Sequence, residues 1–116
     1  MAARAAFAIV EQEETPARDI DLVHLARQTG GDGELEREIL ALFRDQCAKL
    51  SGAILSASTE AARRELAHTL KGAAGAVGAF SVARHAERVE AANEGATIDL
   101  DQASRRATAR IDRLLA

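Results

Sequence analysis

The chain has 116 residues and a formal net charge of −3, and only 3% of its residues are aromatic. This length suits one small domain, and the absence of a basic excess together with the scarcity of aromatic residues argues against a nucleic-acid-binding protein. There is no apolar run of about 18 residues, so we expect no membrane span. The single Cys47 cannot form an internal disulfide, which favours a reducing compartment, and we expect a cytoplasmic protein.

Residues 1–18 are rich in alanine and then in glutamate. We expect them to form an N-terminal arm; the sequence leaves open whether this arm is a short helix, a packed segment or a partly disordered tail. The apolar start of the arm is followed at once by acidic residues without a cleavage-like site, which is not typical of a signal peptide. The helical domain itself is expected over residues 19–116.

A short helix is predicted directly after the arm. Asp19 or Asp21 can cap it, because a carboxylate at that position accepts a hydrogen bond from a free backbone N–H group. Its apolar positions are Leu22, Val23, Leu25 and Ala26. The run Gly30-Gly31-Asp32-Gly33 is expected to end it.

A long helix is predicted from about residue 34 to residue 56, because its apolar residues recur at three-to-four spacing. These residues are Leu35, Ile39, Leu42, Phe43, Leu50, Ala53 and Ile54. Ser58 or Thr59 is expected to cap the next helix, and Gly78 to end it.

Two more helices complete the predicted fold. The fourth runs from about Phe80 to Asn93 and is ended by Gly95, and Asp99 caps the last helix. Four amphipathic helices of about 15–23 residues with short connectors predict an all-α fold. The expected architecture is an antiparallel up-and-down four-helix bundle with a short additional N-terminal helix.

The helix that ends at Gly78 carries one histidine on its polar face. On a helical wheel of about 100° per residue, His68 lies about 180° from the centre of the apolar stripe. That stripe consists of Leu66, Leu70, Ala73 and Val77. Lys71 follows one turn after His68, and Gly72 and Gly75 lie on the same face. Each glycine inside a helix costs roughly 1 kcal/mol relative to alanine, so we interpret this pair as leaving room for a bulky partner.

The run Ala67-His68-Thr69-Leu70-Lys71-Gly72-Ala73-Ala74, closed by Gly78, resembles the active helix of histidine-containing phosphotransfer (HPt) domains. The resemblance extends from about Ile20 to the C-terminus. It implies that His68 is the phosphoacceptor, that Lys71 orients the phosphoryl group, and that Gly72 and Gly75 are supporting small residues.

The resemblance also implies a phosphorelay intermediate. Such a protein accepts a phosphoryl group from the aspartate of a receiver domain and passes it to another response regulator. Its partners would be receiver domains of hybrid histidine kinases and of response regulators, and the Mg²⁺ ion would belong to the receiver. We expect no cofactor of the chain's own and no enzyme, because a nucleotide-binding glycine-rich motif is missing. A monomer is expected, because four helices can close a bundle alone.

Phosphotransfer requires a neutral, exposed imidazole that an aspartyl phosphate can approach in line. We expect His68 to meet this need on a rigid helix, away from buried carboxylates. Arg64 precedes it by one turn, and the preceding long helix can bring Phe43, Arg44 or Gln46 alongside. These residues form the predicted docking surface, where positive charge would attract the acidic active end of a receiver.

Two other interpretations remain open on the sequence. A helical adaptor or scaffold would bind its partner through the same face and would tolerate His68→Ala. A kinase dimerisation domain usually has glutamate after the histidine, where this chain has Thr69. His24 is expected to be half-buried and His85 to be solvated. We expect no metal site, because no His or Cys pair has ligand spacing on one helix.

Overall fold

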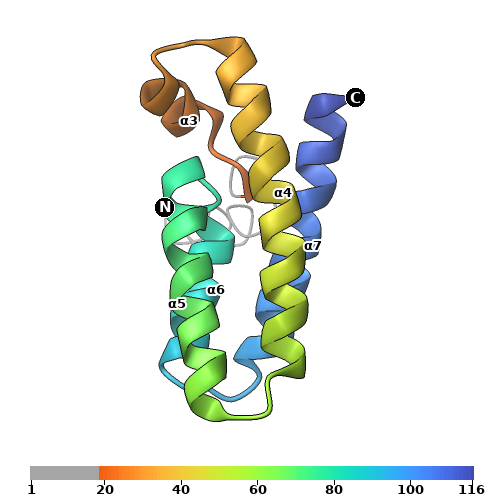
Figure 1. Ribbon diagram of the computed structural model, residues 1–116. Helices are drawn as coiled ribbons and strands as arrows, with labels where there is room; N and C mark the ends of the chain where they lie inside the picture. Colours follow the sequence, from red (N-terminus) through yellow and green to blue (C-terminus); the bar gives the residue numbers. More distant parts are fainter. Residues whose placement is uncertain (1–18) are drawn as a thin grey trace, which may run out of the picture.

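The computed structural model describes residues 19–116, which contain five helices and no strand (Figure 1). The helices are α3 (Leu22–Thr29), α4 (Gly33–Ser56), α5 (Glu60–Val77), α6 (Phe80–Glu90) and α7 (Ala96–Leu115). The predicted all-α fold, with a short helix before four longer ones, is therefore confirmed for this part of the chain. The predicted arm over residues 1–18 lies outside the described residues. Within those residues, no helix is both long enough and apolar enough to cross a membrane.

The four longer helices pack around one apolar core. Helix α4 contacts α5 and α7, α6 contacts the same two helices, and α3 packs on α4 and α5 (Figure 1). Small side chains allow the helices to approach closely, because five alanines at these contacts are fully buried: Ala67, Ala74, Ala86, Ala103 and Ala107. The larger core side chains include Leu40, Phe43, Ile54, Leu70, Leu100 and Ile111.

The short helix α3 is fixed to the end of α5 through the backbone. The Asp21 carboxylate accepts a hydrogen bond from the His24 N–H (3.1 Å), so Asp21 rather than Asp19 is the cap. The Asp21 N–H donates to the Gly78 carbonyl oxygen (2.9 Å). Gly78 has a φ of 88°, and a Cβ there would lie 2.8 Å from the Asp21 carbonyl oxygen. This position therefore needs glycine both for its conformation and for its space.

Helix α5 begins and ends where the sequence predicts. The Thr59 hydroxyl accepts a hydrogen bond from the Ala62 N–H (3.1 Å), and Gly78 closes the helix in the left-handed conformation. The predicted apolar stripe is confirmed, with two members buried and two packed against the core: Leu70 and Val77, and Leu66 and Ala73. The polar face of this helix is therefore fixed in its orientation by the core.

Helix α6 ends at Glu90, three residues before the predicted end at Asn93. Ala92 adopts the left-handed conformation with a φ of 58°. The N–H groups of Ala92 and Asn93 donate to the carbonyl oxygens of Val89 and Arg88, each at 3.0 Å. This pattern is a Schellman motif, which ends a helix and usually has glycine at the left-handed position. Because an alanine occupies that position here, the sequence gives no signal for the end of this helix.

Helix α7 begins at Ala96, before the predicted cap Asp99, so that prediction is wrong. Gly95, with a φ of 76°, is the N-cap and belongs to this helix rather than to the end of α6. Asp99 lies in the first turn, where its backbone N–H donates to the Gly95 carbonyl oxygen (3.2 Å). Its negative charge still suits the helix N-terminus.

Candidate functional site

The imidazole of His68 projects from α5 into solvent, with 70% of its side chain exposed. Its neighbours Ala67 and Leu70 are fully buried, so the core fixes the helix on both sides of it. The position opposite the apolar stripe that the sequence predicts is the position that the structure shows. A partner can therefore reach the ring without any movement of the bundle.

A glutamate at the end of α6 contacts both His68 and Lys71. The His68 Nδ1 lies 2.9 Å from one Glu90 carboxylate oxygen, and the Lys71 Nζ lies 2.7 Å from the other. Only 24% of the Glu90 side chain is exposed. The expectation that His68 lies away from buried carboxylates is therefore wrong, because α6 packs on α5 and brings Glu90 beside the ring.

The charge of Glu90 fixes the proton on the imidazole. The hydrogen bond from Lys71, with a further one from His68, holds the pKa of Glu90 below its ordinary value. The same contact with Glu90 raises the pKa of Lys71. An ionised carboxylate can only accept hydrogen bonds, so His68 must donate its Nδ1–H to it. The lone pair of the neutral ring then lies on Nε2, on the other side of the imidazole.

Sequence reasoning missed Glu90 because it is 22 residues away from His68 along the chain. A signal was present: Ala83, Ala86 and Glu90 recur at helical spacing, so Glu90 lies on the small-residue face that packs on α5. A charged residue on a packed face requires a partner. Lys71 and His68 were the polar residues available on the facing helix.

The two glycines near His68 face open space. A Cβ added at Gly72 or at Gly75 would meet no other atom within 4 Å. Packing within the described part of the chain therefore does not require either glycine, although each weakens the helix. The space beside the imidazole is available to another molecule, as the sequence indicates.

A shallow apolar groove runs between α4 and α5 beside these glycines. It has a volume of about 230 Å³, which is smaller than a typical drug-sized site. Its walls are formed by Ile39, Leu42, Phe43, Gln46, Ala73, Ala76 and Val77. Leu42 is the most exposed large apolar side chain on this part of the surface, at 71%. The α5 residues that line the groove, Ala73, Ala76 and Val77, lie between about one and three turns after His68 on the same helix.

The four predicted docking residues have different surroundings in the structure. Gln46 is exposed and borders the groove, and Arg64 is exposed on α5 one turn before His68. Phe43 is only 2% exposed and forms part of the core beneath the groove. Arg44 extends towards α7, where its guanidinium pairs with Asp112 (3.1 Å). It therefore lies away from the imidazole rather than beside it.

A family model described as Hpt domain matches residues 38–116, from the first turns of α4 to the C-terminus. The chain belongs to the Hpt domain family. Comparison with curated proteins and with solved structures gave no match. Hpt domains are phosphotransfer carriers of two-component systems that interact with receiver domains, and they are not kinases. The match includes His68, Lys71 and Glu90.

The other histidines of this Hpt domain have different surroundings. His24 is half-buried as predicted, with its ring edge against Phe80 and its Nε2 3.2 Å from the Ala76 carbonyl oxygen. The prediction that His85 is solvated is wrong, because its ring is partly buried and its Nδ1 is covered. Within residues 19–116, no group of three or more His, Cys, Asp or Glu side chains could hold a metal ion.

Proposed function

We propose that this Hpt domain is a phosphorelay intermediate in which His68 accepts a phosphoryl group from the aspartate of a receiver domain and passes it to another response regulator. The observation that carries the proposal is an exposed imidazole whose Nδ1 is held by Glu90 at 2.9 Å, so that Nε2 faces outward as the nucleophile. An adaptor would need neither the exposed ring nor its carboxylate partner.

In the proposed transfer, Nε2 attacks the phosphorus of the aspartyl phosphate in line with the leaving oxygen. A P–N bond forms, the P–O bond breaks, and the receiver's carboxylate leaves with the electron pair. The ring gains positive charge as the bond forms, and Glu90 stabilises this charge through the Nδ1–H. Lys71 can turn from Glu90 to the phosphoryl oxygens, which is the orienting role that we assign to it.

We propose that the receiver docks over the groove between α4 and α5. Gly72 and Gly75 supply the clearance beside the ring, and Gln46 borders the apolar contact. We assign Arg64, which is exposed one turn before His68, to the rim of this surface, where it would attract an acidic receiver. Phe43 supports this surface from below, and Arg44 is not included in it. The Mg²⁺ ion belongs to the receiver's acidic pocket, and the Hpt domain supplies no cofactor and binds no ATP.

The proposed arrangement of the long helices is the antiparallel up-and-down bundle. It is supported by the short connections between them, residues 57–59, 78–79 and 91–95, since short connectors join antiparallel neighbours. We further propose that the domain acts as a monomer, because the apolar core closes among the helices of one chain. We also propose that it acts in the cytoplasm.

The test is phosphoryl transfer from a purified phosphorylated receiver domain to wild type and to His68→Gln. Wild type should acquire an acid-labile, base-stable phosphoramidate, and His68→Gln should acquire none. The matched controls His24→Gln and His85→Gln should be labelled like wild type. Labelling of His68→Gln at the wild-type level would refute the proposal, and binding of the receiver without any labelling of wild type would indicate an adaptor.

A further inference from the structure

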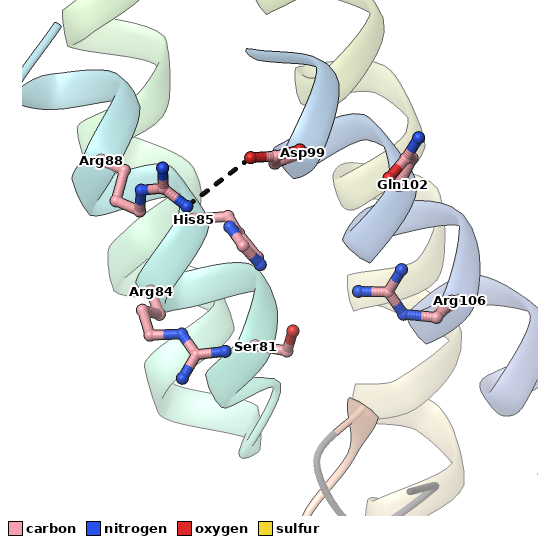
Figure 2. A pocket seen from close by; sticks show the side chains of 7 residues that line it. All are labelled: Ser81, Arg84, His85, Arg88, Asp99, Gln102 and Arg106. Carbon is pink, nitrogen blue, oxygen red and sulfur yellow. Dashed lines mark ion pairs between the residues drawn. The ribbon is translucent and has the colours of Figure 1, made fainter. Parts of the chain in front are cut away.

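A second polar site lies between α6 and α7, on the side of α6 that faces away from His68. It is a cavity of about 600 Å³, and Figure 2 shows side chains from both helices projecting into it. Its volume falls within the range of roughly 300–1,000 Å³ that is typical of small-molecule sites. None of its lining residues takes part in the contacts around the imidazole of His68.

The walls of this cavity carry more positive than negative charge. Arg84 and Arg88 approach from α6 and Arg106 from α7, and Asp99 is the one carboxylate among the lining residues (Figure 2). Asp99 lies 3.6 Å from Arg88. Arg106 pairs at 3.7 Å with Asp19, which is not among the lining residues. Even with Asp19 counted, two carboxylates face three guanidinium groups, so the cavity keeps the positive excess of an anion site.

Two polar groups in the wall are buried without a partner. The Ser81 side chain is only 3% exposed, and its hydroxyl has no hydrogen-bond partner among residues 19–116. Figure 2 shows it directed into the space between the helices. The covered Nδ1 of His85, one turn further along α6, is also without a partner in this part of the chain. A buried polar atom without a partner is costly, which indicates that these groups serve a ligand.

The protonation state of His85 suits the same ligand. Burial, and then the neighbouring Arg84, hold the pKa of His85 below its ordinary value, against an opposing effect of Asp99. Arg88 and Arg106 act in the same direction as Arg84. The neutral ring therefore offers one N–H donor and adds no further positive charge to the crowded arginines.

We propose that this cavity binds a small soluble molecule that carries a phosphate or pyrophosphate group, held by Arg84, Arg88 and Arg106 and by the Ser81 hydroxyl. Guanidinium groups match the oxygens of a phosphate in bidentate pairs. Three guanidinium groups converging on one cavity suit the several oxygens of a phosphate or pyrophosphate better than the two oxygens of a single carboxylate. A long polyanion is disfavoured, because the whole chain carries a net charge of −3.

The test is calorimetric titration of the full chain with inorganic pyrophosphate, with ionic strength held constant by sodium chloride. Wild type should show one saturable site. Arg84→Gln and Arg106→Gln should each weaken binding at least about tenfold, because each removes a charge-assisted hydrogen bond. Ser81→Ala should weaken binding a few-fold, since its hydroxyl is a neutral donor.

Arg105→Gln is the matched control, because Arg105 is adjacent to Arg106, pairs with Asp101 and lies outside the cavity. It should bind pyrophosphate like wild type. His68→Gln should also bind like wild type, so this inference stands or falls independently of the phosphorelay proposal.

Three results would overturn the inference. One is the absence of saturable binding to wild type. Another is equal weakening by Arg105→Gln and Arg106→Gln, which would indicate general charge attraction. The third is sedimentation with phosphatidic acid vesicles without any binding of pyrophosphate, which would indicate a membrane surface instead of a soluble ligand. Melting followed by circular dichroism checks that each variant is folded, and the exposed Arg84 keeps the test decisive if Arg106→Gln is unstable.

Discussion

The contact between Glu90 and His68 predicts how the proposed phosphoacceptor depends on its neighbour. Glu90→Ala removes both the acceptor that fixes the ring and the charge that stabilises the imidazolium. Glu90→Gln keeps an amide oxygen that can accept from Nδ1 and removes the charge alone. The two variants therefore separate orientation of the ring from stabilisation of its charge.

The size of the effect follows from the exposure of the ring. A hydrogen bond to a charged group contributes about 1.5–3 kcal/mol when it is well protected from water. His68 is 70% exposed, so water competes for its Nδ1, and we take the lower end of that range. A loss of about 1.4 kcal/mol is a factor of roughly ten in rate. We therefore expect roughly tenfold slower transfer for Glu90→Ala. Glu90→Gln should slow transfer by less, because its amide oxygen still accepts from Nδ1.

The assay is single-turnover phosphoryl transfer from a phosphorylated receiver, followed by rapid quenching. Glu87→Gln is the matched control, because Glu87 is an exposed carboxylate on the same helix and has the same charge to lose. Nitrogen NMR of the His68 ring supplies an independent readout, since Glu90→Ala should allow both neutral tautomers. Wild-type transfer rates in Glu90→Ala, with an unchanged NMR tautomer signature, would refute the positioning role of Glu90.

Three further predictions concern the surface and the pH response. Gly72→Leu should raise the melting temperature slightly through helix propensity and should block transfer. Gly52 on α4 also faces open space, and Gly52→Leu should leave transfer unchanged. Equal transfer by both variants would show that Gly72 does not border the docking surface. Arg64→Glu should slow association with the receiver, and more strongly at low salt, whereas Arg105→Glu on α7 should not. If Arg64→Glu associated at the wild-type rate at every salt concentration, Arg64 would not belong to the interface. Because the pKa of His85 is lowered in the folded state, the free energy of unfolding should fall as the pH drops below the ordinary pKa of histidine. Urea unfolding of His85→Gln should show a smaller fall. An identical fall in both proteins would contradict this prediction.

The parts of the fold that sequence reasoning predicted are those set by local chemistry. Thr59 and Gly78 bound α5 as expected, because a capping hydroxyl and a left-handed glycine are residue types with strong positional preferences. The exposure of His68 also follows from helical periodicity alone. The end of α6 was missed because Ala92 occupies a conformation that alanine rarely adopts.

The parts that were missed depend on contacts between helices. Glu90 reaches His68 only because α6 packs on α5, and no local pattern fixes which residue of one helix meets which residue of the next. The same holds for Arg44, whose direction is decided by Asp112 on α7. His85 was misjudged because α7 covers one side of its helix.

The helical hairpin formed by α5 and α6 contains the proposed nucleophile His68, the carboxylate that contacts it and the lysine beside it, all within residues 60–90. The groove residues that come from α4, such as Leu42 and Gln46, lie outside this hairpin. Substitutions on α4 can therefore alter which receiver is recognised while the reacting groups keep their geometry. On the proposed docking, the α4 wall of the groove is the part of the recognition surface that can vary without touching the reacting groups, so a lineage could acquire a new signalling connection there without rebuilding its phosphoacceptor.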